Sequence, residues 1–200
     1  MRDRVLEFIK KVQSISQIGL TYSKDPYAVD NYHELKTLST KMLKEYSTIE
    51  HQTYELYTDF KYPTPQPAVR AMVIHEDKLL LVKEKDSGKW SLPGGWCDID
   101  TTPKETVEKE THEESGYLVK TKKMLAIFDR RHYLPESLYD VYSMFFYAKL
   151  VGGEAKCNHE TDEVAWFNID DLPELSRKNS IQEIQIAYNV YLNNLETYFE

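Results

Sequence analysis

Residues 92–117 read LPGGWCDIDTTPKETVEKETHEESGY, and this is the most informative part of the chain. Thr102 is followed three residues later by Glu105, with Pro103 between them, which is the pattern of a capped helix start. Gly116 is the residue type that ends a helix. The sequence therefore predicts a helix between Thr102 and Gly116, directly after a tight turn at 93–95.

This predicted helix is too acidic to be a packing element. Between Lys104 and Glu114 stand five glutamates and two lysines, and Val107 is the one aliphatic residue. At about 100° per residue, Glu110, Glu113 and Glu114 share an arc of about 100° on one face. Like charges at these spacings destabilise an isolated helix. The simplest interpretation is an acidic face exposed to solvent. The tight turn before the helix, however, favours a metal site.

The glycines of that turn favour a metal site. Gly94 and Gly95 let backbone groups approach a ligand closely, because neither carries a side chain. Carboxylates beside carbonyl oxygens are the ligands that Mg²⁺ or Mn²⁺ prefers. A cation would also relieve the repulsion among the glutamates. The stretch therefore predicts a hard divalent cation bound where the turn meets the helix.

Residues 1–62 form a predicted helical domain. Apolar residues recur at helical spacing from Val5 to Ile15, with Gly19 as the expected end, and again from Leu35 to Ile49 after an Asp25-Pro26 start. Two short amphipathic helices bury little by themselves, so we expect them to cap the rest of the chain or to form a homodimer. Acidic and basic residues are balanced here, which argues against a DNA-binding domain.

A proline-rich linker at 63–67 separates this region from a second domain at 68–200. Strands are predicted at 68–75 and 78–85, joined as a hairpin, and further strands at 118–129, 141–151 and 163–168. The chain is predicted to close with an amphipathic helix whose apolar stripe comprises Ile181, Ile184, Tyr188, Tyr191, Leu192, Leu195 and Phe199.

Composition excludes several classes of protein. The 200 residues carry a net charge of −8 with 41% hydrophobic and 29% charged residues, which is typical of a folded globular chain. The negative charge argues against adhesion to nucleic acid or anionic lipid. We expect no signal peptide and no membrane contact, since no apolar run approaches the ~18–20 residues of a membrane span. With only Cys97 and Cys157, we expect reduced thiols and a cytoplasmic protein.

The stretch at 92–117 resembles the Nudix box. That pattern is G, five residues, E, seven residues, then R-E-U-x-E-E-x-G-U, where U is a bulky apolar residue. The residues of this chain at the expected positions are Gly95, Glu110, Glu113, Glu114, Gly116 and Tyr117. The likeness extends over nearly the whole chain, because GLTY at 19–22 and KDPY at 24–27 are similar to a Nudix subgroup with an N-terminal helical domain.

Two charged positions depart from the box. Thr101 stands where the first Glu belongs, and Lys109 stands where the Arg belongs, while the middle apolar position is Thr111. In the family the Arg commonly braces the box by pairing with acidic residues of the loop. We interpret the two replacements as linked, with Asp98 or Asp100 as the substitute acid. We expect these replacements to affect the rigidity of the loop more than metal binding, since the three helix carboxylates are intact.

The resemblance implies an α/β/α sandwich with a mixed sheet, preceded by the small helical domain. It implies metal-dependent hydrolysis of the pyrophosphate bond of a nucleoside diphosphate linked to a group X. Within the subgroup the chain is most similar to the CDP-choline pyrophosphatases of Bacillus-type bacteria, which release CMP and phosphocholine. CDP-choline is the predicted substrate, and ADP-ribose, split to AMP and ribose 5-phosphate by close relatives, is the alternative.

Metal ligands follow from the resemblance, residue by residue. It implies Glu110 and Glu114 as direct ligands of Mg²⁺ or Mn²⁺, Glu113 as a direct or water-mediated ligand, and the carbonyl of Gly94 as a backbone ligand. Such a cation neutralises phosphate charge and lowers the pKa of a bound water. Cys97 is interpreted as structural, because this chemistry requires no thiol nucleophile.

A general base is expected either in the box or in the loop at 159–163. Glu160 is slightly favoured there over Glu163. In the alternative interpretation, both are ordinary loop acids. An Arg matches phosphate oxygens with two donors, and a Trp stacks on a base or on a quaternary ammonium. The candidates for substrate contact on these grounds are Arg70, Trp96, Arg130 and Arg131.

Two further functions remain open from the sequence. The same site is compatible with trimming RNA from its 3′ end, although the negative charge of the chain argues against tight RNA binding. A different class is a catalytically inactive Nudix module that senses a nucleotide and regulates a partner. Thr101 and Lys109 favour that interpretation, and the three intact carboxylates oppose it.

Overall fold

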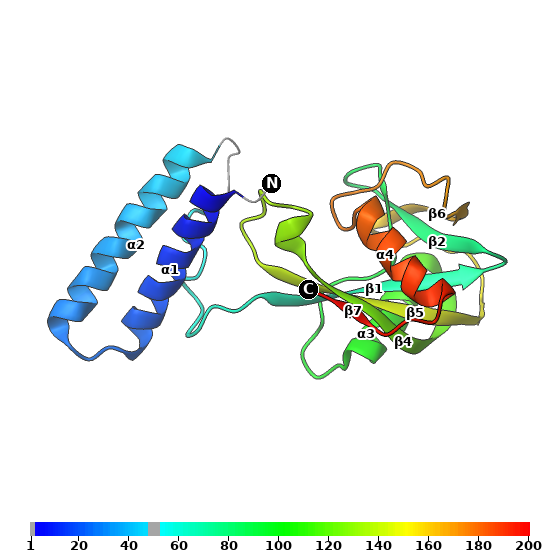
Figure 1. Ribbon diagram of the computed structural model, residues 1–200, viewed down its shortest axis with the longest axis horizontal. Helices are drawn as coiled ribbons and strands as arrows, with labels where there is room; N and C mark the ends of the chain where they lie inside the picture. Colours follow the sequence, from blue (N-terminus) through cyan, green and yellow to red (C-terminus); the bar gives the residue numbers. More distant parts are fainter. Residues whose placement is uncertain (1–2, 48–52) are drawn as a thin grey trace. The chain divides into compact units, whose positions relative to one another are not determined.

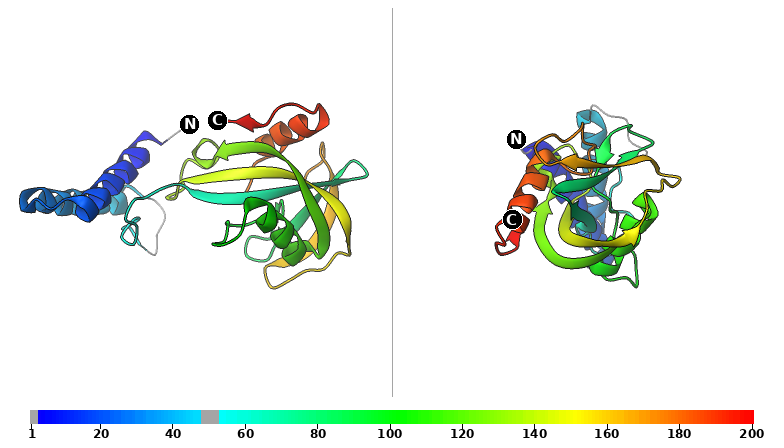
Figure 2. Two further views of the ribbon diagram at one scale, coloured as in Figure 1. Left: turned by 90° about the horizontal axis from the view of Figure 1, so that it is seen from below. Right: turned by 90° about the vertical axis from the view of Figure 1, so that its right-hand side faces the viewer.

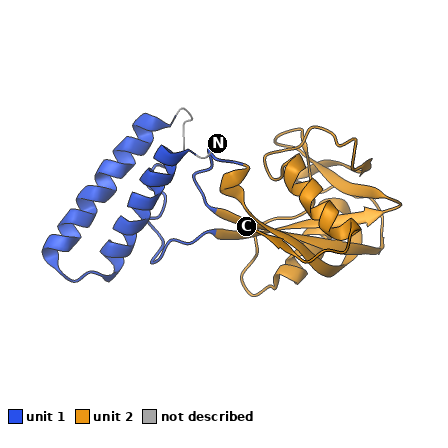
Figure 3. Cartoon of the chain, viewed as in Figure 1, with its two compact units in different colours: residues 1–65, 134–140 blue, residues 66–133, 141–200 orange. Residues whose placement is uncertain are grey.

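The computed structural model describes residues 3–47 and 53–200. Contacts divide the chain into two compact units, one of residues 1–65 with 134–140 and one of residues 66–133 with 141–200 (Figure 3). The segment 134–140 therefore belongs to the first unit, although the sequence-based division placed it within 68–200. Among the described residues, no helix combines the length and the apolar character that crossing a membrane requires.

Two helices, α1 (Arg4–Tyr22) and α2 (Pro26–Tyr46), form the main part of the first unit (Figure 1). The carboxylates of Asp3 and Asp25 accept backbone N–H groups at the two helix starts, where four N–H groups lack an intrahelical partner. The predicted start of the second helix at Asp25 is thus confirmed. Ile49, the last apolar position of its predicted stripe, lies outside the described residues.

The sequence predicted that the first helix ends at Gly19, and this prediction is wrong. Helix α1 continues to Tyr22, and Gly19 lies buried within it. A side chain at position 19 would overlap the ring of Tyr32 on α2. The glycine therefore allows the two helices to approach closely, and its role is in packing and not in termination.

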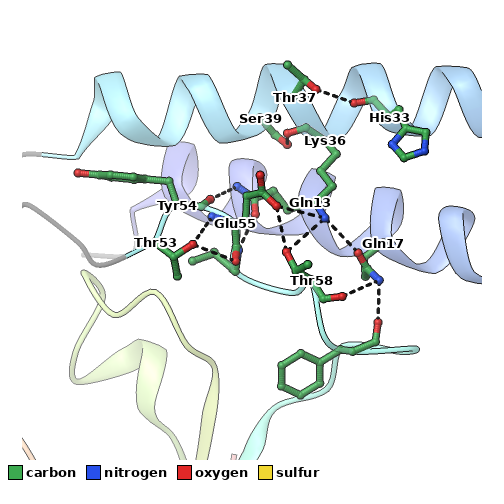
Figure 4. Close-up of polar contacts among 12 residues, drawn as sticks. Gln13, Gln17, His33, Lys36, Thr37, Ser39, Thr53, Tyr54, Glu55 and Thr58 are labelled. Carbon is green, nitrogen blue, oxygen red and sulfur yellow. Dashed lines mark hydrogen bonds and ion pairs between the residues drawn. The ribbon is translucent and has the colours of Figure 1, made fainter.

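The segment at 53–60 is fastened to α1 by two glutamine side chains (Figure 4). Gln13 donates its amide to the carbonyl of Tyr54 at 2.9 Å and accepts the N–H of Leu56 at 3.0 Å. Gln17 donates to the carbonyl of Phe60 at 3.0 Å. Because each bond satisfies a backbone group of an irregular segment, the segment packs against the helix without regular structure of its own.

The segment at 134–140 joins this unit through Lys10. The buried ammonium of Lys10 lies 2.5 Å from the carboxylate of Asp140 and 3.0 Å from the carbonyl of Ser137. The small apolar core of the unit comprises Leu6, Ile9, Leu43, Leu56 and Leu138.

The second unit is a mixed sheet with a helix on each side. Its strands are β1 (Gln66–His75), β2 (Lys78–Glu84), β3 (Trp90–Ser91), β4 (Tyr117–Asp129), β5 (Val141–Gly153), β6 (Thr161–Asn168) and β7 (Tyr198–Phe199). The order along the sheet is β3-β2-β1-β5-β4-β7, and β6 pairs with β2. Strand β1 is parallel to β5, β7 is parallel to β4, and the other pairs are antiparallel.

Helices α3 (Pro103–Ser115) and α4 (Ile181–Leu192) cover opposite faces of the sheet (Figure 2). Alternation along β1 supplies both cores, since successive side chains of a strand point to opposite faces. Val69, Ala71 and Val73 pack with Val107 of α3, whereas Met72 packs in the core that contains residues of α4. This is the α/β/α sandwich expected from the sequence.

The predicted caps of α3 are confirmed. The hydroxyl of Thr102 accepts the N–H of Glu105 at 3.2 Å, and the Glu105 carboxylate accepts the N–H of Thr102 at 2.9 Å. Gly116 ends the helix in the left-handed conformation, with φ of 77°. These local bonds define the helix that carries the box glutamates.

The final helix is shorter than its apolar stripe suggested. Helix α4 ends at Leu192, and Asn194 takes a left-handed φ of 48°. The chain then turns back, so that Tyr198 and Phe199 pair with β4 instead of continuing the helix. Hydrogen bonding to an open strand edge of the sheet therefore prevails over helical periodicity at the C-terminus.

Candidate active site

The glycine turn after β3 runs along the start of β1. The N–H of Val69 donates to the carbonyl of Gly95 at 2.9 Å, and the N–H of Ala71 donates to the carbonyl of Pro93 at 2.8 Å. Gly94 has a φ of 142°, and a side chain there would overlap the carbonyl of Val69. No residue with a side chain fits this close approach, so the turn is held at one position on the sheet.

Glu114 is directed at this turn from α3. Its side chain is nearly buried, with the residue 3% exposed, and its carboxylate accepts the N–H of Gly94 at 2.8 Å. The pKa of Glu114 is raised to about 7, mainly by burial and in smaller part by the nearby carboxylate of Glu110. The bond from Gly94 and the charges of Lys178 and Arg70 offset part of this rise.

Glu110 lies against the same turn. A side chain at Gly95 would stand 2.9 Å from the Glu110 carboxylate, so the glycine leaves the space that this carboxylate occupies. Burial raises the pKa of Glu110; Lys109 opposes this effect, while the charges of Glu113, Asp98 and Glu160 add to it. Glu110 and Glu114 thus place two partly desolvated carboxylates at one glycine turn.

Glu113 does not join them. Its side chain is 53% exposed, and its carboxylate lies 3.9 Å from Lys109 on the same helix. Together with His112 and Cys157, Glu113 lines a cavity of about 420 Å³ that does not include Glu110 or Glu114. Glu113 lies at the edge of the acidic arc predicted from the sequence, and the fold turns only the other two glutamates toward the turn.

The residues at the turn suit a hard divalent cation. Two carboxylates and the Gly94 carbonyl are oxygen donors, and both carboxylates have raised pKa values that a cation would lower again. Within residues 3–47 and 53–200, however, no three side chains of His, Cys, Asp or Glu are gathered closely enough to form a ready-made metal cluster. A cation here would therefore need backbone or water oxygens beside Glu110 and Glu114.

Arg70 is predicted from the sequence to contact the substrate, but it lies buried in the sheet. The residue is 7% exposed, and its guanidinium donates to the carbonyls of Gly94 and Val69. Burial lowers the pKa of Arg70, and Glu114 is the largest influence in the opposite direction. Arg70 therefore supports the glycine turn from inside the sheet.

Arg130 is likewise internal. Its guanidinium donates to the fully buried carboxylate of Glu183 on α4 and to the carbonyl of Arg177. The predicted phosphate contact is thus replaced by an ion pair between a short 3₁₀ helix and α4. The neighbouring Arg131 is partly exposed and is held by Asp129, whose carboxylate accepts its Nε at 2.9 Å.

A cleft of about 430 Å³ opens beside Glu114. The residues that line it include Glu84, Asp86, Glu114, His159, Glu160 and Lys178. Glu163 is not among the lining residues and lies in β6, where its carboxylate is 3.5 Å from Lys83. Of the two candidate bases, the structure brings Glu160 into the cleft.

Trp96 lies next to the turn with 53% of its surface exposed, so its ring is available for stacking. Sequence reasoning missed the charged residues Glu84, Asp86 and Lys178 of the cleft. The side chains of Glu84 and Lys178 lie 3.2 Å apart. The sequence carries no signal for them, because they stand 94 positions apart in ordinary charged contexts. Only the pairing of strands brings the end of β2 beside the segment before α4.

Comparison with known proteins agrees with this geometry. The NUDIX domain model matches residues 64–187. The model of the UDP-X-like, N-terminal oligomerisation domain matches residues 3–57. These two regions correspond to the sheet with its glycine turn and to the helical region that precedes it.

Two curated relatives cover most of the chain. One is the Bacillus subtilis protein named "Putative ADP-ribose pyrophosphatase YjhB", 39% identical over 191 residues, which are 92% of this chain and 90% of that one. The other is the ADP-ribose pyrophosphatase of Methanocaldococcus jannaschii, 30% identical over 83% of this chain and 85% of that one.

Two solved structures have the same fold. The crystal structure of a UDP-X diphosphatase is 29% identical, with a TM-score of 0.67 and full coverage of both chains. An ADP-ribose pyrophosphatase from Streptococcus suis is 40% identical, with a TM-score of 0.63 over 68% of this chain and all of that one. The chain belongs to the Nudix family and is a Nudix pyrophosphohydrolase with an N-terminal oligomerisation domain of the UDP-X type.

Proposed function

We propose that this pyrophosphohydrolase cleaves a nucleoside diphosphate linked to a second group, with ADP-ribose as its first substrate. The names of the B. subtilis and M. jannaschii relatives support this choice, since both matches cover most of the two chains. The UDP-X diphosphatase supports the broader substrate class. CDP-choline, the substrate favoured by the sequence, appears in none of the four names and stays a prediction.

One observation carries the proposal for the site: the buried carboxylate of Glu114 bonds to the backbone of Gly94 at 2.8 Å, beside Glu110. In our proposal, Glu110, Glu114 and the Gly94 carbonyl hold Mg²⁺ or Mn²⁺, whereas Glu113, which lines another cavity, is not a ligand. A bound divalent cation supplies charge neutralisation of the pyrophosphate and a water of lowered pKa.

The chain's own residues would then position the substrate and move the proton. Glu160 lines the cleft of Glu114 and is close enough to Glu110 to influence its pKa, so its carboxylate is the proposed acceptor of the proton of the attacking water. Trp96, exposed beside the turn, is the proposed stacking surface for the base. Arg131 is the remaining arginine candidate for phosphate contact, because Arg70 and Arg130 are buried.

A substrate panel tests the proposal. ADP-ribose, CDP-choline, dinucleoside polyphosphates and short RNA are each incubated with Mg²⁺, with Mn²⁺ or with EDTA, and the products are separated by chromatography. We expect metal-dependent release of AMP and ribose 5-phosphate, abolished by EDTA. Preferred cleavage of CDP-choline would reverse the substrate order. Binding without cleavage of any compound would favour the nucleotide-sensing alternative.

We also propose a homodimer formed through the helical region. Val5, Phe8 and Ile15 lie at intervals of three and seven residues on α1, and all are exposed. Leu35, Leu38 and Met42 form a second exposed apolar row, on α2. Apolar side chains at heptad-like spacing form the seam along which helices associate. The match to an oligomerisation domain supports this assignment.

A further inference from the structure

The cleft beside Glu114 is predominantly acidic. The carboxylates of Glu84, Asp86, Glu114 and Glu160 line it, and of the described lining residues only Lys178 is a lysine or an arginine. A pyrophosphate carries negative charge of its own. Positive charge at a defined point of the cleft therefore favours entry of a pyrophosphate next to these acids, and it would add to the charge of a cation at the glycine turn.

Lys178 is held at that point by Glu84. The two side chains lie 3.2 Å apart, and Glu84 also accepts the hydroxyls of Ser87 at 2.8 Å and Ser176 at 3.0 Å. Burial alone would raise the pKa of Glu84, but these hydroxyls and Lys178 outweigh it and hold the pKa below its ordinary value. Glu84 therefore remains ionised and keeps its partner in place.

The backbone of Lys178 is positioned as well. Its N–H donates to the hydroxyl of Ser176 at 3.2 Å, so one serine contacts both members of the pair. The N–H of Ser176 in turn donates to the carbonyl of Trp90 at 2.7 Å, which joins the segment to β3. Lys178 thus projects from a segment fastened to the strand that leads into the glycine turn.

The ammonium lies in the same cleft as the carboxylate of Glu114, since Lys178 and Glu114 both line it. An ammonium carries three donors, and one partner such as Glu84 engages one of them. With 40% of its side chain exposed, Lys178 can present its other donors to a ligand in the cleft.

We propose that Lys178 is a substrate-binding residue whose ammonium contacts a non-bridging oxygen of the pyrophosphate, and that Glu84 is the positioning residue that orients it. This assignment rests on the proposed pyrophosphohydrolase function. It adds a binding group from outside the Nudix box, supplied by the segment between β6 and α4.

The test compares Lys178→Met with Lys178→Arg and with Lys89→Met as a matched control. Lys89 forms a comparable exposed pair, with Glu174 at 2.6 Å, and does not line the cleft. The ligands are ADP-ribose for turnover, α,β-methylene-ADP for binding by calorimetry, and Mn²⁺ alone for binding by electron paramagnetic resonance.

We expect Lys178→Met to raise two quantities about tenfold: the KM for ADP-ribose, or for whichever compound of the substrate panel is cleaved, and the Kd of α,β-methylene-ADP. Lys178→Arg should recover part of the loss. Binding of Mn²⁺ should be unchanged or tighter, because a positive charge has left an acidic cleft. Lys89→Met should change none of these quantities. Glu84→Gln should raise the KM by less than Lys178→Met does.

Two outcomes would overturn the assignment. One is an unchanged KM and Kd in Lys178→Met. The other is a parallel loss of nucleotide and Mn²⁺ binding, which would indicate that Lys178 only maintains the shape of the cleft. Failure of the proposed function is distinguishable, since it appears as no turnover of any compound by the unmodified protein. Binding of α,β-methylene-ADP still tests Lys178 in that case, and a protein that does not bind this compound at all would also exclude the assignment.

Discussion

The ammonium of Lys109 lies 2.7 Å from the carboxylate of Asp98, across the loop that joins the glycine turn to α3. Lys109 stands where the Nudix box has an Arg, and Asp98 supplies the acid that position 101 lacks. Thr101 instead donates its hydroxyl to the Asp98 carbonyl at 2.9 Å and lies 3.0 Å from the hydroxyl of Thr106. Of the two acids suggested by the sequence, Asp98 is the partner, and the loop is braced despite both replacements.

Loosening this brace should weaken metal binding. Lys109→Ala frees the loop beside Glu110, so we expect the Kd of Mn²⁺ to rise several-fold, with Lys109→Arg close to the unmodified protein. Lys120→Ala is the control, since it removes an ion pair of similar length, 2.8 Å between Lys120 on β4 and Glu108 on α3. Equal effects of the two alanine variants in a Mn²⁺ titration would show that the brace has no special role.

Removing the Glu114 carboxylate should abolish turnover without unfolding the protein. Glu114→Gln retains the size of the side chain and an oxygen acceptor for Gly94, but it removes the negative charge. Loss of a group that only supports a metal ligand lowers metal affinity or activity about 10–100-fold. Because Glu114 is itself the proposed ligand, we expect kcat to fall at least about 100-fold. Glu108→Gln on the same helix is the control. A Glu114→Gln variant with near-normal kcat and an unchanged melting temperature would contradict the metal assignment.

Metal binding should depend on pH near neutrality. Because the pKa of Glu114 is raised to about 7, the carboxyl is protonated in much of the protein below that pH, and a metal must displace the proton. We expect the Kd of Mn²⁺ to increase by up to about tenfold per unit as the pH falls below 7, and to level off above about 8. In Glu114→Gln this slope should diminish. A Kd that stays constant between pH 6 and 8 would refute the link to Glu114.

The buried pair of Arg130 and Glu183 should matter for stability. Arg130→Met leaves the fully buried Glu183 without its cation, and breaking such a pair costs about 3–5 kcal/mol of the free energy of unfolding. Arg131→Met, at the partly exposed neighbour, should have a much smaller effect. Urea denaturation of both variants measures the difference. Similar midpoints for the two would show that Glu183 finds another partner or a proton.

The oligomeric state should respond to charges placed on the apolar rows of the helices. Phe8→Glu with Leu38→Glu puts two carboxylates into the proposed seam, and we expect a monomer by light scattering coupled to size exclusion. Lys41→Glu, a charge change on an exposed position of α2 outside the row, should remain a dimer. If the double variant keeps the mass of the unmodified protein, the seam lies elsewhere.

Elements that depend on nearby residues were predictable from the sequence. The capping box at Thr102 and the end at Gly116 use bonds between residues three or four positions apart, so the pattern alone indicates them. The hairpin turn at Glu76 and Asp77 is likewise local, and both residues take the left-handed conformation there. The candidate site was predictable to the extent that Glu110 and Glu114 lie one turn apart on that helix.

Burial of the arginines and the composition of the cleft were decided by tertiary structure. The sequence indicated Arg70 and Arg130 as candidates for substrate contact, and only the packing of β1 and α4 gives them internal partners at Gly94 and Glu183. Strand pairing brings Lys178 beside Glu84. The helix, the glycine turn and the acids on that helix were predictable from residue type, because the hydrogen bonds that define them join residues within about one helical turn. Contacts between distant residues depend on how strands and helices pack, so only the folded chain decided which charges face the cleft.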